Sequence, residues 1–257
     1  MLKPAYALTA ALVVCAVPAA AERLTLSGTV GTAPVLITLD DDQGKLAGWY
    51  VYLRVGKQIR LEGRRTDGGG FTLDEFTGSA KTGGFAGTVA PAGWTGVWRK
   101  AKGSPALPVA LAENRQPLGD LTGTFRCKAH KTDRQFGYRY SYDLHLQVTK
   151  GTVGRLDLSQ RATTKAGDDQ GCALGLDDLT QMPSPAGLLL KADGDGDRSR
   201  CTVRVIGAGD YLYVKIGDSG QGGNDCHGGD AAMYCSPRSF WADMIFDRKA
   251  STCKPVE

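Results

Sequence analysis

The feature that most restricts the fold of this chain is a series of short alternating runs between Arg23 and Leu111, separated by turns that contain glycine. Apolar and polar residues alternate within each run, as they do in strands with one buried face. The runs cover residues 23–30, 35–40, 45–55, 57–63, 70–76, 83–89, 93–99 and 107–111. Short strands that follow one another about every ten residues are typical of antiparallel barrels and sandwiches. We therefore predict an eight-stranded meander barrel or sandwich in this part of the chain.

The second half of the chain shows the same alternation, with longer irregular stretches between the runs. In Tyr138–Val148, for example, every second residue is apolar. Residues 113–118, within the segment AENRQPLG, have the composition of a linker. We therefore predict an all-β chain with two antiparallel β domains, residues 22–112 and a disulfide-rich domain at residues 119–257, joined by this linker.

Residues 1–21 have the features of a secretory signal peptide. Lys3 precedes an uncharged apolar segment, and Ala19-Ala20-Ala21 provides the small residues of a cleavage site. The apolar segment is too short for a membrane anchor. We expect the segment to be removed and the mature protein to be periplasmic or secreted in a bacterium, with no membrane span.

The cysteines fit an exported protein. Loss of the signal peptide removes Cys15 and leaves Cys127, Cys172, Cys201, Cys226, Cys235 and Cys253. An even number of cysteines in an exported chain predicts disulfide bonds. The short separation of Cys226 and Cys235 predicts that these two are paired, while the pairing of the other four stays open.

The first half of the chain also resembles a known module. The ordered segments LSGTV, APVLITL, GKLAGWYVYLRVGKQIRLEG, GFTLDEF, GGFAGTV, WTGVWR and LPVAL, within residues 23–111, resemble a β module of uncharacterised bacterial exported proteins. The resemblance consists of glycines and aromatic residues. Such modules sometimes lie beside domains similar to lysozyme inhibitors. The resemblance implies placement in the cell envelope and interaction with a protein, and it identifies no functional residue.

Residues 45–55 contain two alternating sets of side chains. If one face of the sheet is buried, we expect Trp49, Val51 and Leu53 in the core, with Tyr50 and Tyr52 on the outer face. Exposed aromatic residues can contact a protein or a sugar. Alternatively, they shield the outer face of the sheet through cross-strand pairs.

The segment Gly217-Asp218-Ser219-Gly220 resembles the surroundings of the nucleophile in trypsin-like proteases. Such a serine requires a histidine base that is oriented by a carboxylate. The trypsin-like arrangement places this histidine in the first domain, and residues 22–116 contain no histidine. A hydrolase that uses Ser219 with His227 or His130 is therefore kept only as an alternative.

Two segments contain residues that can bind metals, and neither predicts a site. Cys226 and His227 lie close together, but a disulfide would remove the thiolate as a ligand. Alternate aspartates at residues 193–197 resemble the start of a calcium loop, but arginines stand where such a loop needs glycine and glutamate. We therefore expect no metal and no cofactor. The formal net charge of +4 is too small to predict binding to nucleic acid.

These observations predict an exported, non-enzymatic binding or inhibitory protein of a bacterial cell envelope. Its partner would be an envelope protein or a small ligand. We expect the first contact surface in the loop at residues 217–237, with His227, Tyr234 and Arg238. The second expected surface comprises Tyr50, Tyr52, Trp94 and Trp98. A further alternative is a small apolar ligand carried inside the first barrel.

Overall fold

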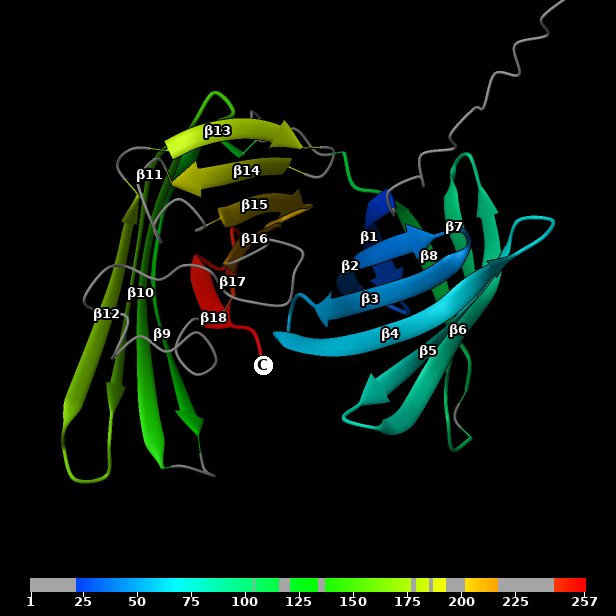
Figure 1. Cartoon of the computed structure of the whole chain (residues 1–257), viewed down its shortest axis with the longest axis horizontal. Coiled ribbons are helices and arrows are strands. Elements are labelled where there is room, and N and C mark those ends of the chain that lie inside the picture. The colour runs from blue at the N-terminus through cyan, green and yellow to red at the C-terminus, as the bar shows by residue number, and fades with distance from the viewer. Residues whose placement is uncertain are drawn as a thin grey trace, which may run out of the picture.

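The computed structural model describes residues 22–103, 105–115, 121–133, 137–176, 179–184, 187–192, 202–216 and 243–257. The regular elements in these ranges are β-strands, and they form a closed barrel and two further sheets (Figure 1). The prediction of an all-β chain is confirmed. Within the described ranges, no helix is long and apolar enough to cross a membrane.

The barrel is a continuous antiparallel meander that closes when β1 pairs with β8. Its strands are β1 (Glu22–Val30), β2 (Ala33–Asp42), β3 (Lys45–Tyr52), β4 (Lys57–Thr66), β5 (Gly70–Thr77), β6 (Ala80–Ala90), β7 (Gly93–Lys100) and β8 (Leu107–Glu113). Each of the eight alternating runs in the sequence forms one of these strands, so the barrel prediction is confirmed.

Side chains fill the interior of this barrel, as the width of a barrel of about eight strands allows. The core includes Leu26, Val35, Ile37, Leu39, Leu46, Tyr50, Leu61, Phe71, Leu73 and Phe85. Some strand positions admit only glycine. A Cβ atom on Gly63 would lie 1.9 Å from the carbonyl oxygen of Thr72. Glycine thus allows β4 and β5 to approach closely where the barrel curves.

The second domain, called here the sandwich domain, consists of two antiparallel sheets. One has the order β12 (Asp169–Leu176), β11 (Thr152–Thr163), β10 (Tyr138–Thr149), β9 (Gly123–Asp133). The other follows chain order, with β13 (Leu179–Ser184), β14 (Gly187–Ala192), β15 (Thr202–Ala208), β16 (Tyr211–Ile216), β17 (Met244–Asp247) and β18 (Thr252–Pro255). Their facing sides share one apolar core.

The alternation in β10 correctly predicts the face that enters this core. Tyr140, Tyr142, Leu144 and Leu146 are all buried, and they pack with residues of the facing sheet such as Val205. Sequence patterns did not predict β12, β13 or β18. These strands begin with polar residues or contain proline, and such residues are uncommon within strands.

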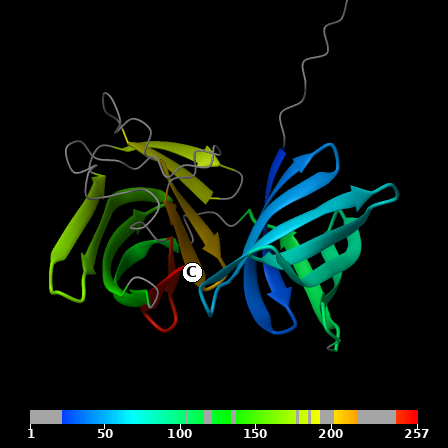
Figure 2. The same ribbon diagram turned by 60° about the horizontal axis from the view of Figure 1, so that its bottom comes forward.

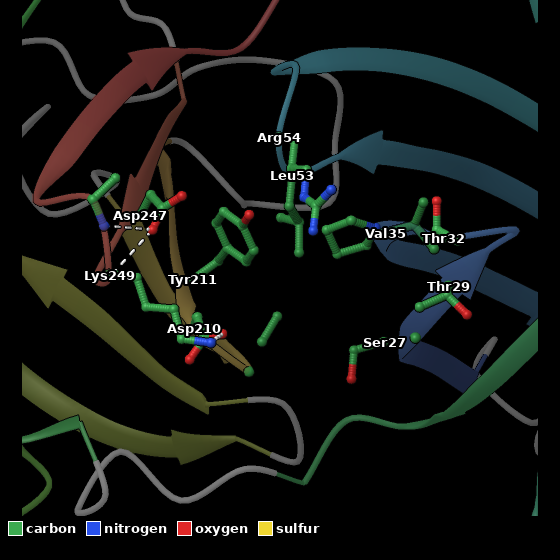
Figure 3. Close-up of a pocket in the computed structure, with 15 residues that line it drawn as sticks. Ser27, Thr29, Thr32, Val35, Leu53, Arg54, Asp210, Tyr211, Asp247 and Lys249 are labelled. Atoms are coloured by element: carbon green, nitrogen blue, oxygen red, sulfur yellow. Dashed lines mark hydrogen bonds and ion pairs between the residues drawn. The ribbon is translucent and has the colours of Figure 1, made fainter.

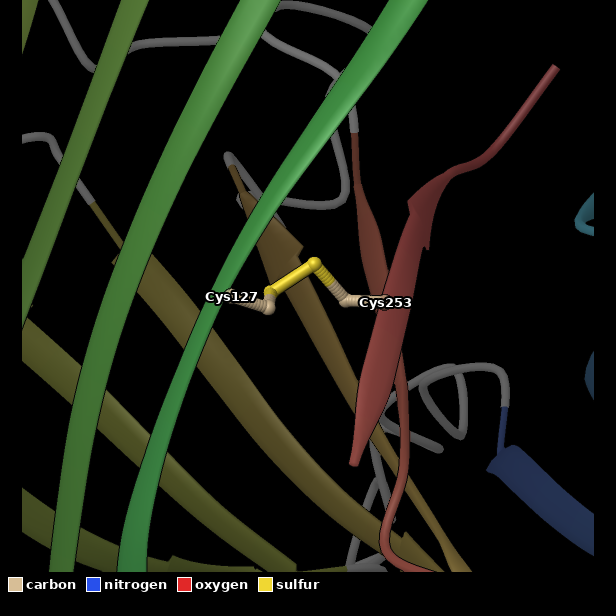
Figure 4. The surroundings of a disulfide bond; sticks show 2 residues. All are labelled: Cys127 and Cys253. Carbon is tan, nitrogen blue, oxygen red and sulfur yellow. A yellow bond between two sulfur atoms is a disulfide. The ribbon is translucent and has the colours of Figure 1, made fainter. Parts of the chain in front are cut away.

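A disulfide bond between Cys127 and Cys253 joins the two sheets of the sandwich domain (Figure 4). Cys127 lies on β9 and Cys253 on β18, so the bond connects two strands that each end their sheet. It therefore closes one side of the sandwich. The predicted pair Cys226–Cys235 and Cys201 lie outside the described residues, and Cys172 lies in β12.

The barrel and the sandwich domain pack together through a third apolar cluster, so the sheet that contains β15 and β16 lies between two cores (Figures 1 and 2). One face of this sheet contributes to the sandwich core, and the other packs against the barrel. The interface includes Leu36, Val51, Leu53, Ile206, Tyr213 and Ile245. Burying each such side chain contributes about 1.5–3 kcal/mol. The two domains therefore share a substantial apolar contact.

The expected orientation of β3 is wrong. Tyr50 is fully buried inside the barrel, whereas Val51 and Leu53 point outward into the interdomain cluster. Tyr50 lies opposite Ile59 in the β3–β4 pairing, and both point into the barrel. The alternation itself was read correctly. Trp49, Val51 and Leu53 are on the outside of the barrel, where the sandwich domain covers them. The prediction assumed an isolated sheet with only one buried face, so it assigned these apolar residues to the inside.

The start of the predicted linker is part of the domain contact. Asn114 follows β8 directly and is 4% exposed. Its backbone N–H donates to the carbonyl oxygen of Thr25 over 2.7 Å, and its side-chain amide donates to the carbonyl oxygen of Gly207 over 2.6 Å. One side chain thus connects the barrel to β15.

Candidate functional site

The first predicted contact surface cannot be placed. Its residues His227, Tyr234 and Arg238 lie outside the described ranges, and so does Ser219, the nucleophile of the hydrolase alternative. The hydrolase alternative therefore stays a prediction. His130, its other candidate base, is exposed on β9.

The second predicted surface is turned inward. Tyr50 and Trp98 both donate to Oε2 of Glu75, over 2.5 and 2.8 Å, and Thr82 donates to Oε1 over 2.6 Å. Tyr52 lies beside this group, 3.4 Å from Tyr50 between hydroxyl oxygens. Glu75 is only 5% exposed. Three of the four aromatic residues therefore meet, but around a buried carboxylate instead of on the outside.

The fourth aromatic residue, Trp94, is also buried. Its ring lies 4.8 Å from that of Phe71, and the guanidinium of Arg65 lies 5.1 Å above it. Phe85 packs edge-on against Tyr50 at 5.4 Å. These rings fill the barrel interior. The expectation that Tyr50 and Trp94 form an exposed contact surface is wrong, because both side chains point into the core of the closed barrel.

Burial changes the ionisation of several tyrosines. It raises the pKa of Tyr50 far above its ordinary value, and the hydrogen bond to Glu75 raises this pKa further. Burial also raises the pKa of Tyr52, and in the sandwich domain the pKa of Tyr142. These phenols therefore stay neutral in the folded protein under conditions that would ionise an exposed tyrosine.

The protein is accordingly expected to lose stability at alkaline pH. An unfolded tyrosine ionises near pH 10, whereas the buried ones hold their protons, so the unfolded chain releases protons first. The stabilisation is complete below about pH 10, and it falls above that by about 1.4 kcal/mol per pH unit for each such tyrosine. Urea unfolding between about pH 9 and pH 12 measures the slope. Tyr142→Phe should give a shallower slope, and a slope equal to that of the wild type would contradict this account.

A cleft lies between the two domains, beside the interdomain cluster (Figure 3). Its volume is about 580 Å³, which lies within the range of small-molecule sites. The barrel contributes the hydroxyls of Ser27, Thr29 and Thr32, the ring of Pro34 and the side chain of Arg54. The first two hydroxyls belong to β1, and Arg54 belongs to the hairpin that connects β3 and β4.

The opposite wall consists of two turns of the sandwich domain. The turn between β15 and β16 carries Asp210 and Tyr211, and the turn between β17 and β18 carries Asp247 and Lys249. The ammonium of Lys249 lies 2.6 Å from Asp210, and this contact raises the pKa of Lys249. Asp247 accepts the backbone N–H groups of Lys249 and Ala250, each over 3.0 Å. The charged groups of this wall are thus engaged with one another or with their own turn.

Arg54 is held differently. Its side chain forms no ion pair or hydrogen bond with any residue in the part of the chain that the structure describes. Its backbone, by contrast, is fixed: its carbonyl oxygen accepts from the ammonium of Lys254. The preceding N–H, of Leu53, donates to the carbonyl oxygen of Pro34 over 3.0 Å. A positioned backbone therefore presents to the cleft a guanidinium that is paired with none of the residues the structure describes.

The C-terminal segment supports the same hairpin. The N–H of Glu257 donates to the carbonyl oxygen of Gly56 over 2.7 Å, and the N–H of Gln58 donates to the carbonyl oxygen of Glu257 over 2.8 Å. This segment follows β18, which the disulfide at Cys253 ties to β9. The hairpin that carries Arg54 is therefore hydrogen-bonded to the segment that follows β18 of the sandwich domain.

The sequence patterns did not predict the cleft, although Arg54 is exposed on the hairpin that follows β3. Asp210, Tyr211, Asp247 and Lys249 lie in short hairpin turns, and such residues in turns are ordinary. Only the packing of one domain against the other brings them opposite β1. No local pattern marks such a convergence.

Among the described residues, no group of three His, Cys, Asp or Glu side chains is arranged to hold a metal ion. The chain matches no protein-family model, and neither the curated proteins nor the solved structures contain a match to it.

Proposed function

We propose that this protein is an exported, non-enzymatic binding protein of a bacterial cell envelope, and that the interdomain cleft is its binding site. The observation that carries the proposal is the cleft itself, whose lining combines apolar side chains with hydroxyls and a guanidinium at the junction of two domains. Ligand sites are commonly concave, largely preformed and located between domains. The signal-peptide features of residues 1–21 support the location.

The composition of the cleft supports binding over catalysis. Among the described residues, its lining contains hydroxyl groups, carboxylates, an amine and a guanidinium but neither histidine nor cysteine. Ser27 therefore has no imidazole base among the lining residues, and a serine nucleophile needs such a base. The barrel interior is a less favourable place for a ligand, because Tyr50, Phe71 and Phe85 already fill it.

A cleft-filling variant tests this proposal. The mature wild type, dialysed against small molecules extracted from bacterial envelopes, is expected to retain a compound that mass spectrometry detects. Thr29→Trp should abolish retention, because an indole there occupies the cleft. Thr72→Trp, the same change at an exposed position of β5, should leave retention unchanged.

Thr32→Trp provides a second cleft variant if Thr29→Trp does not fold, and thermal melts establish folding for each. Retention that is equal in the wild type and in both cleft variants would remove the cleft as the binding site. The absence of any retained compound would overturn the small-ligand form of the proposal.

A further inference from the structure

We infer that the ligand of the cleft carries an anionic oxygen group, a carboxylate or a phosphate, which Arg54 binds. This inference rests on the proposed function and adds the chemical class of the ligand. It follows from the charges that face the cleft, from the positioning of the Arg54 hairpin and from the apolar surface beside it.

The first step concerns charge. Arg54 and Lys249 are the cations that line the cleft among the described residues, and Lys249 is paired with Asp210 over 2.6 Å. Arg54 has no carboxylate partner within the described residues. A guanidinium offers up to five N–H donors in a planar fork that matches a carboxylate or a phosphate. An anion bound here would therefore gain a charge-assisted contact that none of the described residues makes with Arg54.

The second step concerns positioning. Leu53 beside Arg54 is 1% exposed, and the carbonyl oxygen of Arg54 is bound by Lys254. Only the side chain of Arg54 then has to be ordered when a ligand binds, which keeps the entropic cost of binding low. The hydroxyls of Ser27, Thr29 and Thr32 on the same wall can donate to further ligand oxygens.

The third step concerns the rest of the ligand. Tyr211 is 9% exposed and belongs to the interdomain cluster with Leu53. Its ring lines the same cleft as Arg54 (Figure 3), and the pyrrolidine of Pro34 adds further apolar surface to the lining. The expected ligand therefore combines an anionic head with a small apolar or ring-shaped body.

Four probes that share a phenyl ring and differ in their polar group test the inference: benzoate, phenyl phosphate, benzyl alcohol and benzylamine. We expect the mature wild type to bind benzoate or phenyl phosphate at least about tenfold more tightly than benzyl alcohol, by titration monitored with NMR. The preference between the two anions identifies the head group. Affinity for the anion should decrease as salt is added, because salt screens the contact of an accessible charge.

Variants assign the contact to Arg54. Arg54→Gln should weaken binding of the preferred anion about tenfold or more, and Arg54→Lys should lose less. Arg64→Gln, which removes the same charge from an exposed position on β4, should bind like the wild type. Anion binding that is unchanged in Arg54→Gln, or anions that bind no better than benzyl alcohol, would overturn the inference.

The outcomes separate this inference from the proposed function. If benzyl alcohol or benzylamine binds best and Thr29→Trp abolishes that binding, the cleft is a binding site and only the anionic class is wrong. If no probe binds, the anionic class is overturned, and the dialysis experiment alone decides the proposed function.

Discussion

Replacing Cys127 and Cys253 together by serine is expected to lower the free energy of unfolding by about 4–5 kcal/mol. The two cysteines are 126 residues apart, so the bond strongly restricts the unfolded chain. Replacing both thiols removes this one cross-link and leaves no unpaired partner that could exchange. Chemical unfolding of the two proteins without reductant gives the difference, and a loss below about 1 kcal/mol would contradict the assigned role.

The same variant is expected to loosen the C-terminal segment. The hydrogen bonds of Gln58 and Glu257 connect this segment to the barrel, next to the Arg54 hairpin. Without the bond at Cys253, their amide hydrogens should exchange faster, while the amide of Leu39 within the barrel should change less. Equal protection of Gln58 and Glu257 in both proteins would show that the disulfide does not position this segment.

Replacing Glu75 by alanine is expected to destabilise the folded protein by about 3–5 kcal/mol. The substitution leaves the buried donor of Tyr50 and the partly buried donors of Thr82 and Trp98 without their carboxylate acceptor. It also opens a cavity among aromatic rings. Thermal and chemical unfolding measure the loss.

Two further variants separate this network from general effects of charge. Glu75→Gln keeps an acceptor oxygen and should cost less than Glu75→Ala. Glu62→Ala removes a carboxylate from the exposed side of β4, where it pairs with Arg60, and should change stability by no more than about 1 kcal/mol. A loss in Glu75→Ala as small as that in Glu62→Ala would mean that the buried network contributes little.

Local patterns predicted much of the fold. Strand side chains repeat with a period of two, and this repeat located the eight barrel strands and the buried face of β10. The same period-two repeat also indicated that Glu75 is buried, and this was missed. Glu75 is in phase with Phe71 and Leu73, which are both buried, so the sequence already placed this carboxylate on the inner face of β5.

Another missed signal lies in the second half of the chain. The segments of β15 and β16, TVRVIGA and YLYVKI, are apolar at consecutive positions. Such runs indicate strands that are buried on both faces. The sequence analysis did not recognise the second buried face of these strands, which packs against the barrel.

The sequence by itself determined the strand type, the order of the barrel strands and which side chains share a face. The tertiary structure alone decided that Tyr50 points inward while Val51 and Leu53 meet the sandwich domain, that Cys127 pairs with Cys253, and that Arg54 faces Tyr211 across a cleft. The physical reason is that a period of two distinguishes two faces without saying what covers each of them. That depends on contacts between residues far apart in the chain, which become neighbours only when the two domains pack.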